Sequence, residues 1–380
     1  MMVIESLGEA SSVARIKVLV LYGGRSPEHE VSCISAKSVL AAIDHKRFDV
    51  VAVGIDRHGR WHLQDIHKLM ASAAPALPLH TGGIHALPSQ QAGEGALLVT
   101  QKGKPARKVT FDVVFPVMHG SFGEDGTLQG MLEMMGVPYV GCGVLASALC
   151  MDKDIAYRLA RREGIPVPDY LAIEDFEWGA RRKEAMSFAG KWGCPVFVKP
   201  ARTGSSVGVS KVKRPSELVA AFDKAFAFDS KVLVQRAILG REIECAVLGG
   251  VGDLFASRPA EILPSHDFYS YEAKYLDPQG AKLLVPAPLS KTKEDRVRAL
   301  ALDCFTALDC YGMARVDFLM AGKDGKVYFN EVNTIPGFTS ISMYPKMLEA
   351  SGIPYPKIVE RLIALALQRS AKESKRRLVK

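Results

Sequence analysis

The stretch GMARVDFLMAGKDGKVYFNEVNTIPG, residues 312–337, decides the fold of the C-terminal region, because its pattern is that of a β-hairpin. Apolar residues alternate with polar ones along 314–320 and again along 326–333, and the sequence Lys-Asp-Gly at 323–325 lies between the two runs. Alternation with a period of two residues is typical of half-buried strands. A short glycine-containing turn between two such runs predicts a hairpin.

The length of the turn predicts which residues lie opposite each other. If residues 323–325 form the loop, Asp317 is opposite Glu331 and Arg315 is opposite Asn333. Directly opposed side chains on one face have Cβ atoms only about 5 Å apart. The alternation assigns the remaining positions to faces: Ala314, Val316 and Phe318 on one side of the first strand, Arg315, Asp317 and Leu319 on the other, and Val327 and Phe329 on the same side of the second strand as Glu331 and Asn333.

Two carboxylates this close repel each other unless positive charge lies between them. Arg315 supplies part of that charge. A divalent cation would supply more, and the amide oxygen of Asn333 would complete a set of oxygen ligands that suits Mg²⁺ or Mn²⁺ and not zinc. The alternative is a ladder of surface ion pairs on a polar sheet face, which a register slip of one residue would favour. The residues by themselves leave both interpretations open.

A second stretch, VKPARTGSSVGVSKV at 198–212, has the composition of a phosphate-binding loop. It combines glycines with hydroxyl residues, but it lacks the P-loop pattern G-x-x-x-x-G-K-[ST]. Lys199 ends a strand that the pattern predicts to be buried, and Lys153 follows the apolar run SALCM. Each lysine is either a phosphate contact or a solvated surface residue. Magnesium held by few carboxylates usually also binds phosphates, which favours the phosphate interpretation.

The first part of the chain predicts a parallel α/β sheet. Residues 16–21 form a short apolar strand, a glycine-rich turn follows, and Ser26 is placed to cap a helix. Further strands are expected over 48–56 and over 109–119, so that strands alternate with helices. Residues 65–107 have weak periodicity and predict an irregular insertion with a small edge hairpin over 95–105.

Composition indicates a globular protein of two or three domains, with 380 residues, 48% hydrophobic and 24% charged. No apolar run is long enough for a membrane helix, and we expect no signal peptide. Seven scattered cysteines without a C-x-x-C pair indicate reduced thiols in a cytoplasmic protein and argue against zinc.

The formal net charge of +8 is concentrated at the C-terminus, where RSAKESKRRLVK at 369–380 contains six basic residues and one acidic residue. We interpret this segment as a frayed, solvated tail, with a nucleic-acid or membrane contact as the alternative. A nucleic-acid-binding protein would gather basic residues on a folded face with stacking aromatics, and the body of the chain has no such pattern. We therefore expect neither a nucleic acid nor a membrane as a partner.

Five ordered segments carry a family resemblance. They are GGRSPEHEVS at 23–32, HGSFGEDGTLQGMLEMMGVPYVGCGVLASALCMDK at 119–153, VKPARTGSSVGVSKV at 198–212, FYSYEAKY at 268–275, and the hairpin with its continuation to Ser340. In this order they resemble the D-alanine–D-alanine ligase family of the ATP-grasp superfamily. The resemblance covers roughly residues 16–365, and five long motifs in order make it specific.

The resemblance implies an α/β (α+β ATP-grasp) fold of three domains. A parallel α/β pre-ATP-grasp domain over 14–141 would precede two ATP-grasp domains, over 142–234 and 235–370, that hold ATP between them. The family also implies a cytoplasmic enzyme of peptidoglycan precursor synthesis that is usually a homodimer. Its reaction joins two D-alanines: ATP phosphorylates the carboxylate of the first, and the amine of the second displaces phosphate from the acyl phosphate.

The family's functional residues map onto this sequence by motif. Two magnesium or manganese ions are implied, with the ligands Asp317, Glu331 and Asn333. The ATP-binding residues implied are Lys153, Lys199, Ser205, Ser206, Gln235, Arg236, Glu242 and Lys274. Gln235 and Arg236 stand where the family often has Glu-Lys, so the adenine contact through Gln235 would lack a charge.

For the two D-alanines, the resemblance implies that Glu28 binds the first ammonium, with His119 lining the same pocket. Ser342 would bind the second carboxylate, and Lys274 would lie near the second substrate and the phosphate. Arg315 and the backbone N–H of Gly337 would stabilise the oxyanion. Two loops, over 201–209 and 266–282, would close the site through hydrogen bonds of Tyr275 toward Ser205 and Glu28.

Two other functions remain as alternatives at this stage. One is an ATP-grasp ligase with a different second substrate, such as D-lactate, against which Tyr275 and Ser342 argue. The other is a nucleotide-binding regulatory protein without catalysis, against which the complete set Arg315, Asp317, Glu331 and Asn333 argues.

Overall fold

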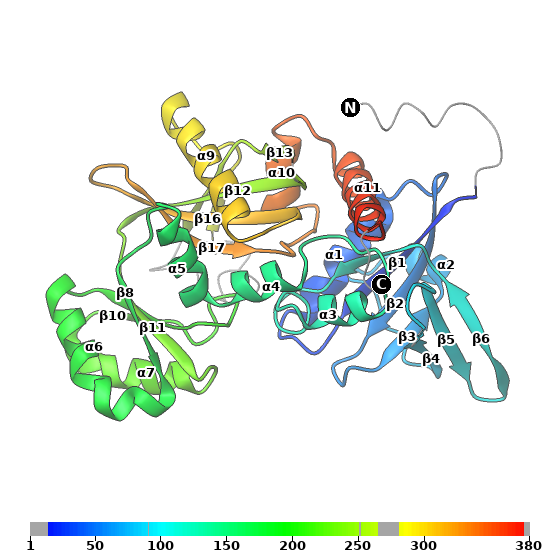
Figure 1. Ribbon diagram of the computed structural model, residues 1–380, viewed down its shortest axis with the longest axis horizontal. Helices are drawn as coiled ribbons and strands as arrows, with labels where there is room; N and C mark the ends of the chain where they lie inside the picture. Colours follow the sequence, from blue (N-terminus) through cyan, green and yellow to red (C-terminus); the bar gives the residue numbers. More distant parts are fainter. Residues whose placement is uncertain (1–13, 90, 251, 265–280, 376–380) are drawn as a thin grey trace.

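The computed structural model describes residues 14–89, 91–250, 252–264 and 281–375. Within these ranges the chain forms three β-sheets with helices between and around them (Figure 1). The α/β class expected from the sequence is confirmed. The segment 265–280, which contains Lys274 and Tyr275, lies outside the described residues, and the roles of these two residues stay predictions.

The N-terminal sheet has the strand order β6-β5-β4-β3-β2-β1-β7. Its parallel part consists of β1 (Ile16–Gly23), β2 (Phe48–Ile55) and β7 (Val113–Val117), with β1 in the middle. Helix α1 (His29–Ala42) packs on β1 and buries Ala36, Val39 and Leu40. The parallel strands and the helix between the first two confirm the sequence prediction for this part.

The expected irregular insertion is instead regular. It contains α2 (Ile66–Ala71) and three strands, β4 (Ile84–Pro88), β5 (Ala96–Gln101) and the start of β6 (Lys104–Thr110). Together with β3 (Trp61–Gln64), which precedes it, these strands extend the sheet in antiparallel fashion. The β5–β6 hairpin lies at the sheet edge, as predicted. The other strands are short and separated by Pro- and Gly-rich loops, and β6 is mostly exposed. Few positions therefore need to be apolar, and the sequence shows little alternation of apolar and polar residues.

Three short helices lead from the first sheet to the second: α3 (Thr127–Met134), α4 (Val144–Met151) and α5 (Lys153–Arg162). Leu128, Leu132 and Met135 pack in the core under the N-terminal sheet, as their helical spacing predicts. Asp152 caps α5 by accepting hydrogen bonds from the backbone N–H groups of Asp154 and Ile155. This cap fixes Lys153 at the first turn of α5, at the edge of the cavity described below.

The central sheet has the order β10-β9-β11-β8. Its strands are β8 (Tyr170–Glu174), β9 (Val196–Pro200), β10 (Ser210–Val212) and β11 (Lys231–Arg236), with helices α6 (Trp178–Trp192) and α7 (Leu218–Phe226) on its outer side and 3₁₀ turns η1 (Asp175–Glu177) and η2 (Pro215–Glu217) before them (Figure 1). The glycine-rich loop joins the antiparallel strands β9 and β10, as predicted. Strand β11 continues two residues past the expected boundary at 234.

The third sheet has the order β15-β14-β12-β16-β17, with β13 paired to β12. Its strands are β12 (Gly240–Gly250), β13 (Asp253–Ala256), β14 (Ala260–Pro264), β15 (Ala281–Leu284), β16 (Gly312–Ala321) and β17 (Val327–Asn333). Helix α9 (Lys291–Ala307) covers one face with Val297, Leu300 and Phe305. The other face packs on α10 (Met343–Glu349) and α11 (Tyr355–Glu373), which share one core cluster with the N-terminal sheet.

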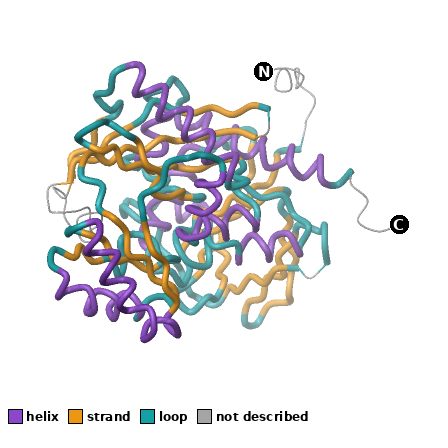
Figure 2. The backbone as a smooth tube through the Cα atoms, turned by 60° about the vertical axis from the view of Figure 1, so that its left-hand side comes forward, coloured by secondary structure: helices purple, strands orange, loops and turns teal. Residues whose placement is uncertain are grey.

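The basic C-terminal segment is not entirely a frayed tail, because α11 continues through it to Glu373. Arg369 donates hydrogen bonds to the carbonyl oxygens of Gly141 (2.8 Å) and Tyr139 (2.9 Å). Its guanidinium also lies over the rings of Tyr139 and Tyr311. Viewed from another side, the C-terminal end of α11 projects at the margin of the molecule (Figure 2). No helix among the described residues is both long and apolar enough to span a membrane.

We predict that Arg369→Ala destabilises the fold, because it removes two charge-assisted hydrogen bonds and two ring contacts, with a cost of about 2 kcal/mol. The melting midpoint should fall by about 2–4 °C. The control is Lys372→Ala, which removes an exposed charge from the last turn of the same helix. Equal melting midpoints for the two variants would contradict this role of Arg369.

Candidate active site

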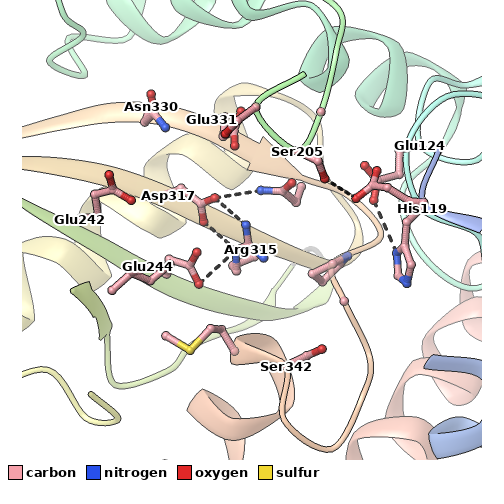
Figure 3. Close-up of a pocket in the computed structure, with 18 of the residues that line it drawn as sticks. His119, Glu124, Ser205, Glu242, Glu244, Arg315, Asp317, Asn330, Glu331 and Ser342 are labelled. Carbon is pink, nitrogen blue, oxygen red and sulfur yellow. Dashed lines mark hydrogen bonds and ion pairs between the residues drawn. The ribbon is translucent and has the colours of Figure 1, made fainter. Parts of the chain in front are cut away.

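One cavity of about 590 Å³ is lined by residues of the central and third sheets, and by residues of α1 and of the segments that follow β1 and β7 in the N-terminal part (Figure 3). Of the site residues predicted from the sequence, the following line this cavity: Glu28, His119, Lys153, Lys199, Ser205, Ser206, Gln235, Glu242, Arg315, Asp317, Glu331, Asn333, Gly337 and Ser342. Arg236 does not line it. Its guanidinium pairs with Asp169 at 3.4 Å and lies over the ring of Trp192.

The predicted strand pairing at the hairpin is confirmed. Arg315 lies opposite Asn333, and Asp317 lies opposite Glu331. The turn, however, is one residue longer than expected, because the N–H of Ala321 donates to the carbonyl oxygen of Lys326.

A β-bulge compensates for the longer turn. Nearer the turn Phe318 pairs with Phe329, so Asn330 is the extra residue on β17. The bulge reverses the alternation. Phe329 is therefore buried in the core, while Glu331 lines the cavity. The prediction that Val327 and Phe329 share a face with Glu331 and Asn333 was wrong for this reason.

Arg315 holds the centre of the carboxylate cluster (Figure 3). It makes a two-bond ion pair with Asp317, at 2.8 and 2.7 Å, and lies 3.2 Å from Glu244. Asn333 donates its amide N–H to Asp317 at 3.0 Å. Burial alone would lower the pKa of Arg315, but Asp317 and Glu244 raise it well above its usual value. The charged guanidinium of Arg315 is therefore bound to the carboxylate of Asp317, which was predicted to bind a metal ion.

Glu244 was not predicted as a site residue. The sequence around it alternates, with Ile243 and Cys245 buried, and this alternation places Glu242 and Glu244 together on the polar face. In the structure Glu244 on β12 lies opposite Asp317 on the neighbouring strand β16. Glu242 lines the same cavity further from Arg315.

Two lysines line the cavity near Glu331 of the hairpin. Lys153 donates to the carbonyl oxygen of Thr203 at 2.8 Å and lies 3.3 Å from Glu331. Lys199 donates to the hydroxyl of Tyr157 at 3.1 Å, and that hydroxyl donates to Gln235 at 3.1 Å. Burial, with a smaller contribution from Lys153, lowers the pKa of Lys199 to about 7. An anion bound beside Lys199 would favour its charged form.

The glycine-rich loop reaches across to the N-terminal sheet. Ser205 donates a hydrogen bond of 2.6 Å to Glu28, so the two residues that the resemblance links through Tyr275 are also in direct contact. Ser205 and Ser206 both have positive φ, at 50° and 60°, an uncommon conformation for residues with a side chain. Gly120 lies beneath the same carboxylate, where an added Cβ would come within 2.6 Å of Glu28. Glu28 is therefore enclosed from two sides.

His119 is buried between the N-terminal sheet and the loop after β17. Its Nδ1 lies 2.8 Å from the carbonyl oxygen of Ile335 and 3.9 Å from Glu124. Burial raises the pKa of Glu124 to about 7. Burial would lower the pKa of His119, but Glu124 and Glu28 raise it, and the result is a pKa above the ordinary value. Glu124 is a second cavity residue that was not predicted, although it lies within the motif HGSFGEDG.

Gly337 and Ser342 lie together at the other end of the cavity. The Ser342 hydroxyl accepts from the N–H of Thr339 at 3.0 Å and lies 2.8 Å from the Thr339 hydroxyl. A Cβ added to Gly337 would come within 2.9 Å of the Ser342 hydroxyl oxygen. The absence of a side chain at 337 therefore leaves both the backbone and this hydroxyl accessible to a ligand.

The cavity therefore combines oxygen ligands for a hard cation, two lysines for a polyanion, and a separate carboxylate at Glu28 for an ammonium group. Arg315 already shows that a cation fits between the carboxylates. This set of groups suits a nucleoside triphosphate with magnesium or manganese, together with a small zwitterionic substrate.

Comparison with known proteins identifies the family. The family model described as D-ala D-ala ligase N-terminus matches residues 17–142, and the one described as D-ala D-ala ligase C-terminus matches residues 159–364. The D-alanine--D-alanine ligase A of Bradyrhizobium diazoefficiens is 51% identical over 359 residues, covering 93% of this chain and 96% of that protein.

Solved structures agree. The chain is similar to the VanG D-Ala:D-Ser ligase of Enterococcus faecalis, with a TM-score of 0.81, 38% identity, and coverage of 93% of this chain and 99% of that one. It is equally similar to the D-alanine-D-alanine ligase of Coxiella burnetii, with a TM-score of 0.81, 36% identity, and coverage of 96% and 97%. With both family models matched and half of all aligned residues identical in a near full-length relative, the chain belongs to the D-alanine–D-alanine ligase family.

Proposed function

We propose that this protein joins two D-alanine molecules to D-alanyl-D-alanine with ATP, through an acyl phosphate, for peptidoglycan precursor synthesis. The observation that carries the proposal is one cavity in which Glu28, the two lysines and the hairpin's oxygen ligands converge. The relatives named D-alanine--D-alanine ligase support the choice of substrates.

ATP would bind between the central and third sheets. Lys153 and Lys199 would bind its phosphates, Ser205 and Ser206 would close over them from the loop, and Glu242 would accept from the ribose. Gln235 would take the adenine amino group through its amide oxygen. That oxygen already accepts from Tyr157, which also bonds Lys199, so the adenine and phosphate contacts are coupled through one hydroxyl. Arg236 would contribute at most through its backbone, because its side chain pairs with Asp169.

Magnesium or manganese, with two ions expected from the family, would be held by Asp317, Glu331 and Asn333. The all-oxygen donor set fits these metals. When bound, the ions neutralise charge on the transferring phosphoryl group. Arg315 would then have to leave Asp317, and Glu244, 3.2 Å away, is the carboxylate that remains to hold it.

The two D-alanines would lie at opposite ends of the remaining space. Glu28, held by Ser205, would bind the first ammonium beside His119, and Ser342 would bind the second carboxylate. Arg315 and the N–H of Gly337 would donate to the oxyanion that develops when the second amine attacks.

Lys274 and Tyr275, in the loop outside the described residues, would complete the closed site as the resemblance implied. The acyl phosphate is easily hydrolysed, so closure of both loops would exclude water during turnover.

We also propose the domain division 14–141, 142–234 and 235–370, which the three sheets support to within the two extra residues of β11. A cytoplasmic location and a homodimer follow the family resemblance. The exposed side chains of Met134 and Leu145, on the adjoining helices α3 and α4, offer apolar surface for a second copy. Light scattering of the purified protein would test the dimer, and a mass of one chain would contradict it.

Neither alternative function is favoured. A regulatory protein without catalysis has no need of the cluster in which Arg315 is paired with two acids at the cavity floor. D-serine as the second substrate has the support of one structural relative, the D-Ala:D-Ser ligase at 38% identity, whereas sequence relatives at 45–51% identity are D-alanine--D-alanine ligases. None of these relatives is named as a ligase for D-lactate.

The deciding experiment is phosphate release from ATP with and without D-alanine, followed by identification of the product. We expect release that depends on both D-alanine and Mg²⁺ or Mn²⁺, and D-alanyl-D-alanine as the product. D-lactate and D-serine, each offered with D-alanine, serve as competing second substrates. Phosphate release without D-alanine, or a preferred product other than the dipeptide, would contradict the proposal.

We predict that Gly337→Ala selectively weakens binding of the second D-alanine. The new Cβ would come within 2.9 Å of the Ser342 hydroxyl, which must then move from its position beside Thr339. The KM for D-alanine at the second subsite should rise by about tenfold or more, since a 1 Å misplacement can cost up to about a hundredfold. Steady-state kinetics would measure it, and an unchanged KM would contradict the placement of Ser342.

A further inference from the structure

We propose that Ser35 on α1 is a positioning residue for the oxyanion-binding loop, residues 335–338, and that it acts through His119 and the backbone of Phe338. This inference rests on the proposed function, because the loop's task is to present the N–H of Gly337. Ser35 touches neither the expected substrates nor the expected metal ligands. None of the sequence motifs assigned it a role.

The contacts of Ser35 join parts of the chain that are far apart in sequence. Its hydroxyl oxygen accepts a hydrogen bond of 3.2 Å from the N–H of Phe338 and lies 2.9 Å from Nε2 of His119. The other ring nitrogen of His119 lies 2.8 Å from the carbonyl oxygen of Ile335. Ser35 has no exposed surface. One hydroxyl of the N-terminal part therefore holds both ends of a short loop in the C-terminal part.

Counting protons gives the direction of two of the bonds. The carbonyl oxygen of Ile335 only accepts, so Nδ1 of His119 carries the hydrogen that it receives. The Ser35 oxygen accepts from the N–H of Phe338. Toward Nε2 of His119 the Ser35 hydroxyl donates when the imidazole is neutral, and it accepts when both ring nitrogens are protonated, the form that Glu124 and Glu28 favour. In both forms hydrogen bonds connect Phe338 through Ser35 and His119 to Ile335. Every member of this buried chain is satisfied, which is the condition under which such a chain makes one conformation rigid.

The loop is fixed on both sides of Gly337. Ile335 is held through its carbonyl oxygen and Phe338 through its N–H, while the hydroxyl of Tyr355 donates to the carbonyl oxygen of Phe338. The ring of Phe338 packs against the rings of Phe115 and Tyr344 in the shared core. Gly337 itself lines the cavity between these anchors. The direction of its N–H thus depends on bonds made by its neighbours.

The consequence concerns one step of the reaction. Phosphoryl transfer to the first D-alanine depends on the lysines, the metal ligands and the ammonium site at Glu28. Ser35 bonds none of these groups, although it bonds His119 in the same pocket. The attack of the second amine depends on donors placed where the oxyanion develops, and donors of this kind are sensitive to small displacements. Loss of the Ser35 hydroxyl should therefore slow peptide-bond formation much more than acyl phosphate formation.

The test uses Ser35→Ala in the full-length protein, with Ser38→Ala as the matched control. Ser38 is on the same helix, and within the described part of the chain its hydroxyl bonds the carbonyl oxygen of Ile34 one turn earlier. Tyr355→Phe is the second variant, since it removes the other anchor of Phe338 without leaving a hole. Thermal melting of all three shows which variants fold.

Two rates are measured for each protein. Dipeptide formation reports the whole reaction. Positional isotope exchange in ATP labelled with ¹⁸O between the β and γ phosphorus atoms, at D-alanine concentrations that fill mainly the first subsite, reports reversible phosphoryl transfer alone. For Ser35→Ala we expect dipeptide formation to fall by about tenfold or more, with exchange within about twofold of wild type. Tyr355→Phe should change in the same direction, and Ser38→Ala should match wild type.

A parallel loss of both rates in Ser35→Ala, or no loss of either, would overturn the positioning role. If Ser35→Ala does not fold, the same ratio in Tyr355→Phe decides, and equal losses there would overturn it. A wild-type protein that makes no dipeptide at all would instead refute the proposed function, so the two failures are distinguishable.

Discussion

The structure depends on one electrostatic constraint, the placement of Asp317 directly opposite Glu331 on neighbouring strands. Like charges in that position are costly unless a cation lies between or beside them. The chain supplies two: Arg315 from the same strand and Lys153 from the first turn of α5. In such a site metal ions can take the place of Arg315 and Lys153 beside the acids, and Lys153 is then available to bind a polyphosphate.

The residues that balance these acids and complete the site come from three different parts of the chain. Lys153 and Lys199 come from the central part, the acids from the third sheet, and Glu28 from the turn after β1. The third and N-terminal sheets share one core through α10 and α11, so their relative position is fixed by packing. The central sheet has its own core and reaches the others through α5 and the Ser205 loop. Movement for substrate entry is most readily accommodated at those links.

The sequence predicted the opposed pairs at the hairpin correctly, although it missed the longer turn and the bulge at Asn330. These two deviations offset each other at Asp317, because each shifts the register by one residue. Buried acids such as Glu244 and Glu124 were missed, since a single sequence does not separate a buried carboxylate from an exposed one. The insertion at 65–107 was misread because its strands are short and its edge strand is mostly exposed, which removes the periodicity.

The most direct test of the account is a crystal structure with Mn²⁺ and a non-hydrolysable ATP analogue. The account predicts anomalous manganese density bounded by Asp317, Glu331 and Asn333, with Arg315 released from Asp317 and retained by Glu244. Manganese density away from these three residues, or Arg315 still paired with Asp317 beside the bound nucleotide, would contradict it.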